Sequence, residues 1–153
     1  MPELPKGKVE GTRKNAKRLV IYSKPKTGKT SLFALLENNL IIDLENGTDY
    51  VTALKVKANS VEDIQSIGEA VKAAGKPYEY ITVDTVTVLE DMVRPLALQL
   101  FKKTAMGASS SVTDVLKLPN GAGYLYLREA FFKVLDYIDT LAENIILSGH
   151  LKD

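Results

Sequence analysis

Residues Leu19 to Leu32 constrain the fold more than any other stretch of this chain. They read Leu-Val-Ile-Tyr, then Ser-Lys-Pro-Lys-Thr-Gly-Lys-Thr, then Ser-Leu. The first four residues form a short apolar run, which predicts a buried strand, and the residues from Lys29 onward predict a helix. The small and basic residues between them predict a tight loop. The stretch therefore predicts a strand, a loop and a helix in immediate succession.

The loop of this unit carries a phosphate-binding pattern. Gly28-Lys29-Thr30 ends a P-loop (Walker A) motif, with Ser23 at the opening position that is normally glycine. Backbone N–H groups of such a loop surround a phosphate, and the helix N-terminus adds a favourable dipole. We expect a bound nucleotide, with Lys29 at the outer phosphates and Thr30 as a ligand of Mg²⁺. The expected contact residues are Ser23, Lys24, Pro25, Lys26, Thr27, Gly28, Lys29, Thr30 and Ser31. The alternative is a strand–turn–helix unit that binds nothing.

The bulk composition describes an ordinary globular domain. The 153 residues suffice for one domain with a substantial core, at 45% hydrophobic and 25% charged residues. No apolar run approaches the roughly 20 residues of a membrane span, and no signal-peptide segment is present. The absence of cysteine excludes disulfides and thiolate metal sites. These features suit a cytoplasmic protein, and the net charge of +1 confines any nucleic-acid site to a local region.

A basic N-terminal arm, Met1 to Arg18, precedes a core predicted over residues 19–153. The basic residues of the arm are Lys6, Lys8, Arg13, Lys14, Lys17 and Arg18. One interpretation is a solvated arm, and the other is an arm that contacts a neighbouring subunit or nucleic acid. The segment itself does not separate the two.

Further apolar runs predict strands that alternate with helices. The predicted strands are Leu40–Leu44, Tyr80–Asp84 and Asn144–Leu147, with a short extended piece at Ala53–Val56. The predicted helices are Lys29–Asn38, one that Ser60–Asp63 caps and Gly75 ends, Val86–Lys103 with a break at Pro95, and Tyr124–Glu143. Glycine and serine in Ala105–Gly123 predict a mobile loop with one short turn. The alternation predicts a three-layer α/β domain with a mostly parallel sheet.

Each predicted main strand is followed by polar residues. In open α/β sheets, ligands bind at the carboxyl ends of the strands. Asp84 ends an apolar strand in the Walker B arrangement, which predicts a carboxylate beside Mg²⁺, directly or through water. The alternative is that Asp84 or Thr85 only caps the helix that begins at Val86.

Glu45 is the predicted group that orients the attacking water. Hydrolysis of a terminal phosphate needs a base or water-positioning group beside it, and the residue after Asp84 is Thr85 rather than an acid. The neighbouring strand end offers Glu45, with Asp43 as its rival on the same side of the strand. The alternative is that both acids are solvated or capping. His150, the only histidine, ends the last strand and is a candidate sensor of the γ-phosphate.

These motifs resemble the RecA-like ATPase core. The resemblance rests on Lys29-Thr30, the strand that runs into Glu45, Ile-Thr-Val-Asp-Thr85 and Ser-Gly-His150. Pro119-Asn-Gly-Ala-Gly-Tyr124 and Gly149-His150 with Lys152-Asp153 are similar to segments of small phage-encoded RecA-like ATPases, which are related to single-strand annealing and recombination proteins. The resemblance implies ATP and Mg²⁺ as ligands, Glu45, Lys29 and His150 as catalytic residues, and Thr30 and Asp84 at the metal.

The resemblance also implies topology and partners. The strand that ends in His150 would lie between the P-loop strand and the Asp84 strand, and the Glu45 strand would lie beside the Asp84 strand. Ala105–Gly123 would contact single-stranded DNA, copies of the chain would form a ring or filament, and a phage-encoded protein would act in the host cytoplasm. A RecA-like core has further C-terminal strands, so the resemblance predicts a C-terminally truncated core.

Two other functions stay open from the sequence. A P-loop kinase of a small molecule needs an arginine-bearing lid, for which Arg94 and Arg128 are the candidates. A nucleotide-dependent interaction module would instead use ATP to order Ala105–Gly123 for a protein partner, without significant turnover.

Overall fold

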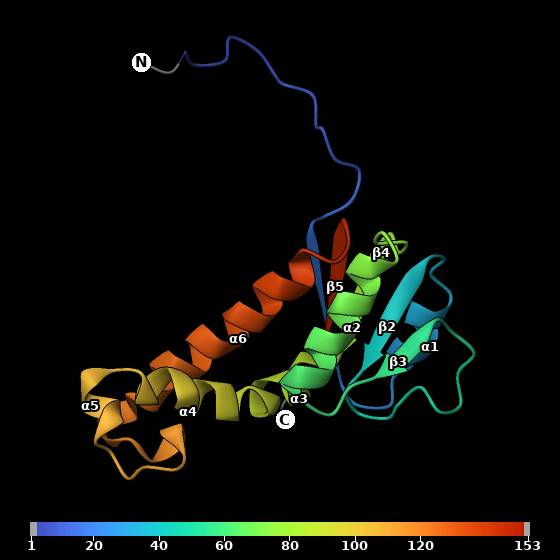
Figure 1. Cartoon of the computed structure of the whole chain (residues 1–153). Helices are drawn as coiled ribbons and strands as arrows, with labels where there is room; N and C mark the ends of the chain where they lie inside the picture. The colour runs from blue at the N-terminus through green and yellow to red at the C-terminus, as the bar shows by residue number, and fades with distance from the viewer. Residues whose placement is uncertain (1–2, 152–153) are drawn as a thin grey trace.

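The computed structural model describes residues 3–151 and contains one parallel sheet. The strands are β1 (Arg18–Ser23), β2 (Asn39–Asp43), β3 (Lys55–Lys57), β4 (Tyr80–Asp84) and β5 (Asn144–His150). They lie in the order β1-β5-β4-β2-β3, and all four pairings are parallel (Figure 1). The described residues do not include Met1, Pro2, Lys152 and Asp153. The first two residues of the basic arm and the predicted similarity at Lys152-Asp153 therefore lie outside the described residues.

The described part of the chain also contains six α-helices and two 3₁₀ turns, of which α4, beside α6, and α5, beside α4, lie away from the sheet (Figure 1). The helices are α1 (Lys29–Ala34), α2 (Val61–Ala73), α3 (Val86–Met92), α4 (Arg94–Lys102), α5 (Ala105–Ala108) and α6 (Gly123–Asp139). The 3₁₀ turns are η1 (Val115–Lys117) and η2 (Pro119–Gly121). None of the helices in residues 3–151 has the length and apolar character needed to cross a membrane.

The two faces of the sheet carry cores of very different size. On one face, Ile42, Val83 and Leu147 belong to a large apolar core that also includes residues of α2, α3, α4 and α6. On the other face, Ile41 and Ile146 pack with Phe33 of α1 in a small cluster. Successive strand residues point to opposite faces, which is why each apolar run serves both cores. The predicted three-layer α/β fold with a parallel sheet is confirmed, with one thin helical layer.

Several local predictions are confirmed. The Ser60 hydroxyl accepts a hydrogen bond from the Asp63 N–H at 3.1 Å and caps α2. Gly75 follows this helix with a φ of +79°, a conformation that glycine adopts without a steric penalty. The segment predicted to break at Pro95 is divided into α3 and α4 at Val93.

Two helices end earlier than predicted. α1 stops at Ala34 rather than Asn38, and the Asn39 side chain donates to the Phe33 carbonyl at 3.1 Å, which satisfies the helix end. α6 begins one residue early and stops at Asp139 rather than Glu143. At that end, Lys17 Nζ donates to the carbonyls of Asp139 and Ala142 at 3.0 and 2.8 Å. A side chain from outside the helix therefore contacts each end, from nearby in sequence at α1 and from far away at α6, and helical periodicity cannot reveal either contact.

The short turn predicted within Ala105–Gly123 is present as η1, but the rest of the segment is more regular than the predicted mobile loop. The segment contains α5, η1 and η2, and Val115 is fully buried. A Cβ on Gly123 would lie 1.7 Å from the Val115 carbonyl oxygen, and one on Gly107 would lie 1.8 Å from the Phe101 carbonyl oxygen. Glycine is needed at both positions for close backbone approach, so its presence reflects tight packing rather than flexibility.

The predicted position of the last strand in the sheet is confirmed. β5 lies between β1 and β4, and β2 lies beside β4. β5 continues past Leu147 to His150, because its last two residues pair with Tyr22 and Ser23 of β1. Leu44 follows β2 and extends its association with β4 by donating to the Asp84 carbonyl at 2.7 Å.

The basic arm reaches the body of the protein at its C-terminal end. Lys17 binds the carbonyl end of α6, and Arg18 donates to Asp139 Oδ2 at 2.8 Å and to Asp136 Oδ1 at 2.9 Å. These carboxylates raise the pKa of Arg18, through the Asp139 hydrogen bond above all. Residues 3–12 are exposed and lead away from the sheet (Figure 1). Three of the basic residues, Arg13 included, thus complement the negative end of a helix dipole.

Candidate active site

The loop between β1 and α1 has the conformation of an anion cradle. Lys26 and Gly28 have φ angles of +61° and +93°, so the chain curls tightly before the helix begins. The first hydrogen bond of the helix runs from the Leu32 N–H to the Gly28 carbonyl at 3.0 Å. The N–H groups of Lys29, Thr30 and Ser31 precede that bond and have no acceptor within the helix. They form a donor set that suits a phosphate.

Ser23 has a role that the sequence did not predict. Its hydroxyl lies 2.6 Å from Thr27 Oγ1 and 2.7 Å from Lys29 Nζ. The sequence predicts Ser23 as a tolerated small residue at this normally glycine position and as a contact of the nucleotide, whereas in the structure its hydroxyl connects the start, middle and end of the loop. Lys29 is 9% exposed, so its ammonium group lies at the base of the loop.

Thr30 and Asp84 meet at the end of the loop. Thr30 Oγ1 donates to Asp84 Oδ2 at 2.7 Å, and Asp84 is 3% exposed. A hydroxyl and a carboxylate oxygen are hard ligands that suit Mg²⁺. Within residues 3–151, no cluster of three or more His, Cys, Asp or Glu side chains could hold a metal ion. The donor set fits a Mg²⁺ that takes its remaining ligands from nucleotide phosphates and water, as this ion usually does.

Glu45, which follows β2, is held by two side chains. Its Oε1 is 2.7 Å and its Oε2 is 3.0 Å from His150 Nε2. The Thr85 hydroxyl donates to Glu45 Oε1 at 2.9 Å. Thr85 is fully buried, caps α3, and is joined to Asp84 by a cis peptide bond. From the sequence, the position of Thr85 directly after Asp84 predicts at most a helix cap, and the contact of Thr85 with Glu45 was not predicted.

Asp43, the alternative to Glu45 as the water-orienting acid, accepts hydrogen bonds from the loop that follows β2. Its carboxylate accepts hydrogen bonds from the N–H groups of Glu45, Gly47 and Thr48 at 3.0–3.2 Å and from the Thr48 hydroxyl at 2.6 Å. Burial opposes ionisation, but these hydrogen bonds outweigh it and hold the pKa of Asp43 below its usual value. Asp43 therefore shapes the loop that carries Glu45.

The His150 side chain contacts both Lys29 and Glu45. Its Nδ1 is 3.5 Å from Lys29 Nζ, and its backbone N–H donates to Thr87 Oγ1 at 3.1 Å. The side chains surround a cavity of about 380 Å³. The lining includes every residue from Pro25 to Ser31 together with Glu45, Gly47, Val51, Asp84 and His150. Of the predicted site residues, Ser23 and Lys24 do not line the cavity, and Gly47 and Val51 are additions that carried no sequence signal.

The chain was compared with known proteins. Residues 15–153 match the family described as the AAA domain. The match covers both the P-loop and the strand that ends in His150. No match was found among curated proteins.

Proposed function

Because the chain belongs to the AAA domain family, we propose that it is an ATPase of the RecA-like kind and uses Mg²⁺. Family membership indicates nucleotide-binding ATPase activity in general. The observation that carries the proposal is the convergence of Lys29, Thr30, Asp84, Glu45 and His150 on one cavity. These side chains come from the ends of β2, β4 and β5 and from the start of α1.

The P-loop supplies the binding functions. Backbone N–H groups of the loop and the buried Lys29 ammonium offer hydrogen bonds and positive charge to the β- and γ-phosphates. Thr30, and Asp84 directly or through water, would hold Mg²⁺. When bound, this ion neutralises charge that develops on the phosphate oxygens.

Glu45 supplies the hydrolytic function. Its carboxylate orients a water molecule toward the γ-phosphorus and accepts a proton as the water oxygen attacks. The bond between the γ-phosphorus and the bridging oxygen breaks, which gives ADP and inorganic phosphate. Thr85 fixes the carboxylate through Oε1, and His150 contacts both carboxylate oxygens. His150 also lies close to Lys29, which supports its role as a γ-phosphate sensor.

We extend the proposal to a partner and an assembly. The sheet order and the motifs are those expected of RecA-like ATPases of the phage single-strand annealing type, so turnover should respond to single-stranded DNA. Lys26 and Lys29 are the basic residues of the described cavity lining, so a basic residue of a neighbouring copy would complete the charge on the transferring phosphate. A ring or filament in the host cytoplasm follows from this proposal.

The test compares inorganic phosphate release by the wild type and Glu45→Gln, with and without single-stranded DNA. The variant should bind ATP normally and release phosphate at least about a hundredfold more slowly, because the amide cannot accept the proton. Glu37→Gln, which changes an exposed glutamate beyond α1, is the matched control and should behave as wild type. Equal turnover in wild type and Glu45→Gln would refute the assignment.

The same assay separates other functions. Tight ATP binding without phosphate release would favour an interaction module. Loss of the γ-phosphate to a small-molecule acceptor, without release to water, would indicate a kinase.

A further inference from the structure

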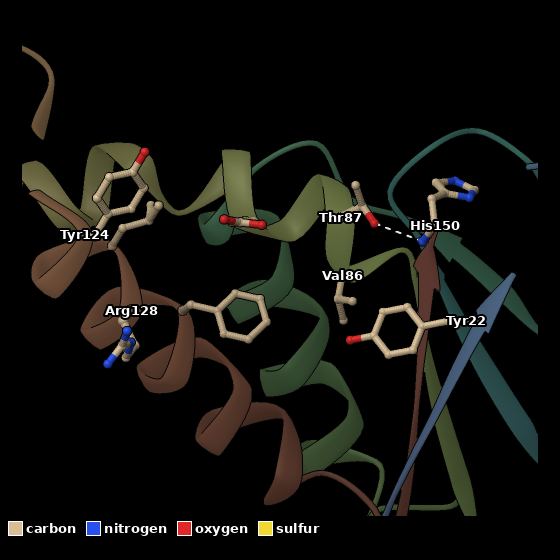
Figure 2. A pocket seen from close by; sticks show the side chains of 9 residues that line it. Tyr22, Val86, Thr87, Tyr124, Arg128 and His150 are labelled. Atoms are coloured by element: carbon tan, nitrogen blue, oxygen red, sulfur yellow. Dashed lines mark hydrogen bonds between the residues drawn. The ribbon is translucent and has the colours of Figure 1, made fainter. Parts of the chain in front are cut away.

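A second cavity adjoins the first and shares His150 with it. It measures about 430 Å³ and lies between the carboxyl end of the sheet, α3 and α6. In Figure 2, Tyr22 and His150 lie on one side of it, and Tyr124 and Arg128 lie on the other. The remaining lining residues are Val86, Thr87, Glu90, Leu127 and Phe131. Apart from His150, the residues that line it are not among those that line the P-loop cavity.

Aromatic rings are the main feature of this cavity. Tyr22 and Tyr124 are 58% and 61% exposed, although each lines the cavity. Phe131 contributes a half-buried ring. The Tyr22 ring lies directly over Gly149, where an added Cβ would come within 2.5 Å of Tyr22 Cε1. The open aromatic faces suit a flat, unsaturated ligand that stacks on them.

The charged side chains of the cavity are not engaged within the described chain. Arg128 and Glu90 are exposed, and neither has a hydrogen bond or ion pair among residues 3–151. A free guanidinium beside aromatic rings can bind a phosphate while the rings take a base. A free carboxylate can accept a hydrogen bond from an N–H group of a base, whether an exocyclic amino group or the N3–H of thymine.

From this combination we propose that the second cavity binds one unstacked nucleotide of a single strand of nucleic acid. The base packs against Tyr124, Tyr22 or Phe131, and Arg128 binds the adjoining phosphate. Stacking accepts any base, so binding depends little on sequence. This proposal rests on the proposed function for the identity of the partner, and it names the surface that receives it.

The second cavity replaces Ala105–Gly123 as the expected contact with a single strand. That segment is folded onto α4 and α6, contains no aromatic residue, and offers Lys117 as its one basic side chain. The cavity instead combines rings with an unengaged arginine. An acidic peptide could also use Arg128, but the exposed tyrosine faces favour a base.

The cavity is connected to the ATP site through Thr87. Thr87 lines the cavity, and its hydroxyl accepts the hydrogen bond from the His150 backbone N–H at 3.1 Å. The His150 side chain contacts Glu45 in the first cavity. A single strand of nucleic acid that packs against Thr87 therefore acts on His150, which contacts the Glu45 carboxylate. Thr87→Val, which keeps the shape and removes the acceptor, should leave strand binding intact and abolish stimulation of turnover.

The binding test uses a fluorescein-labelled oligothymidylate of about 20 nucleotides, with the full chain and a non-hydrolysable ATP analogue. Tyr124→Ala should weaken binding by about tenfold, and Tyr124→Phe should retain it because the ring face remains. Arg128→Gln should weaken binding and reduce the slope of log affinity against log salt by about 0.7, the value for one lost phosphate contact to a single strand.

Two variants on the same helix serve as controls. Leu125→Ala removes a side chain as exposed as that of Tyr124, at 63%, from a position outside the cavity. Lys133→Gln removes one positive charge elsewhere on α6. Both should bind the oligonucleotide as the wild type does.

The outcomes separate this proposal from the ATPase proposal. If the wild type does not turn over ATP but Tyr124→Ala still weakens oligonucleotide binding, the cavity proposal stands and the hydrolytic one fails. If Tyr124→Ala and Arg128→Gln bind as tightly as the controls, the cavity proposal is wrong. Changed self-association of these variants with unchanged strand binding would likewise overturn it in favour of a protein interface.

Photocrosslinking gives a second readout. An oligonucleotide with 5-bromodeoxyuridine should crosslink to peptides that contain Tyr22, Tyr124 or Phe131. Crosslinks confined to peptides outside the cavity would contradict the proposal.

Discussion

Glu45 and His150, 105 residues apart in sequence, lie with Oε1 and Nε2 2.7 Å apart. Both side chains line the cavity that Thr30 and Asp84 also line. It depends on the sheet order, because β4 separates the strands that end near these two residues. Thr85, which follows β4, binds the same carboxylate and completes the connection.

Replacing His150 should impair turnover more than ATP binding. His150→Gln keeps a hydrogen-bonding side chain but shifts its donor, so the carboxylate of Glu45 loses a defined partner. We expect kcat to fall by about tenfold to a hundredfold, with ATP affinity within about threefold of wild type. Phosphate release and equilibrium binding of a fluorescent ATP analogue measure the two quantities. A loss confined to binding would contradict a role beside the reacting groups.

The Thr30 hydroxyl should control the Mg²⁺ requirement. Thr30→Ala removes both the predicted metal ligand and the partner of Asp84 Oδ2, whereas Thr30→Ser retains the hydroxyl. We expect the alanine variant to need at least about tenfold more Mg²⁺ for half-maximal turnover, and the serine variant to resemble wild type. A Mg²⁺ titration of turnover checks this. Identical titration curves for all three proteins would exclude Thr30 as a ligand.

Asp43 should contribute to stability above about pH 4. Asp43→Asn turns an amide group toward N–H donors, so we expect a loss of about 2 kcal/mol in the free energy of unfolding at neutral pH. Because the folded state lowers the pKa of Asp43 below its unfolded value of about 3.9, the contribution is present above that value. It is lost as pH falls through the folded pKa.

Urea unfolding at several pH values tests this prediction. The difference between wild type and Asp43→Asn should shrink as the solution is acidified below about pH 4. Asp49→Asn, which breaks the exposed ion pair with Lys57, is the control and should cost well under about 1 kcal/mol. A pH-independent difference would mean that the charge of Asp43 is not the cause.

Lys17 should stabilise the C-terminal end of α6. Its ammonium group donates to the carbonyls of Asp139, Ala142 and Glu143, all within 3.0 Å. Lys17→Ala should reduce stability by about 1 kcal/mol and lower Tm by about 2–4 °C. Lys14→Ala, which removes an exposed lysine of the same arm, should leave Tm unchanged. An equal shift in both variants would indicate a general charge effect.

The sequence was informative where a local pattern decides the structure. Apolar runs located the main strands, and the Ser60 capping pattern located the start of α2. The polar residues after these strands also indicated which side chains meet, because parallel strands end at the same edge. The side chains of Lys29, Asp84 and His150 are gathered there as the alternation implied.

The sequence was uninformative where the role of a residue depends on contacts that form only in the folded chain. Gly123 reads as a loop glycine, yet it is required by the backbone of Val115. Ser23 reads as a tolerated replacement, but its hydroxyl binds Lys29. The second cavity has no sequence signature, because Tyr22 of β1 and Tyr124 of α6 are far apart in sequence and line one cavity only in the folded protein.

The position of β5 has a consequence for how the chain folds during synthesis. β1 pairs with β5 alone among the described strands, and Arg18 pairs with Ile145. The strand that leads into the phosphate loop therefore leaves the ribosome early and has no partner strand until Asn144–His150 has been made. Contacts of such long sequence separation slow folding and leave apolar strands exposed in the meantime. Nascent chains that end before Asn144 should thus be aggregation-prone and require chaperones.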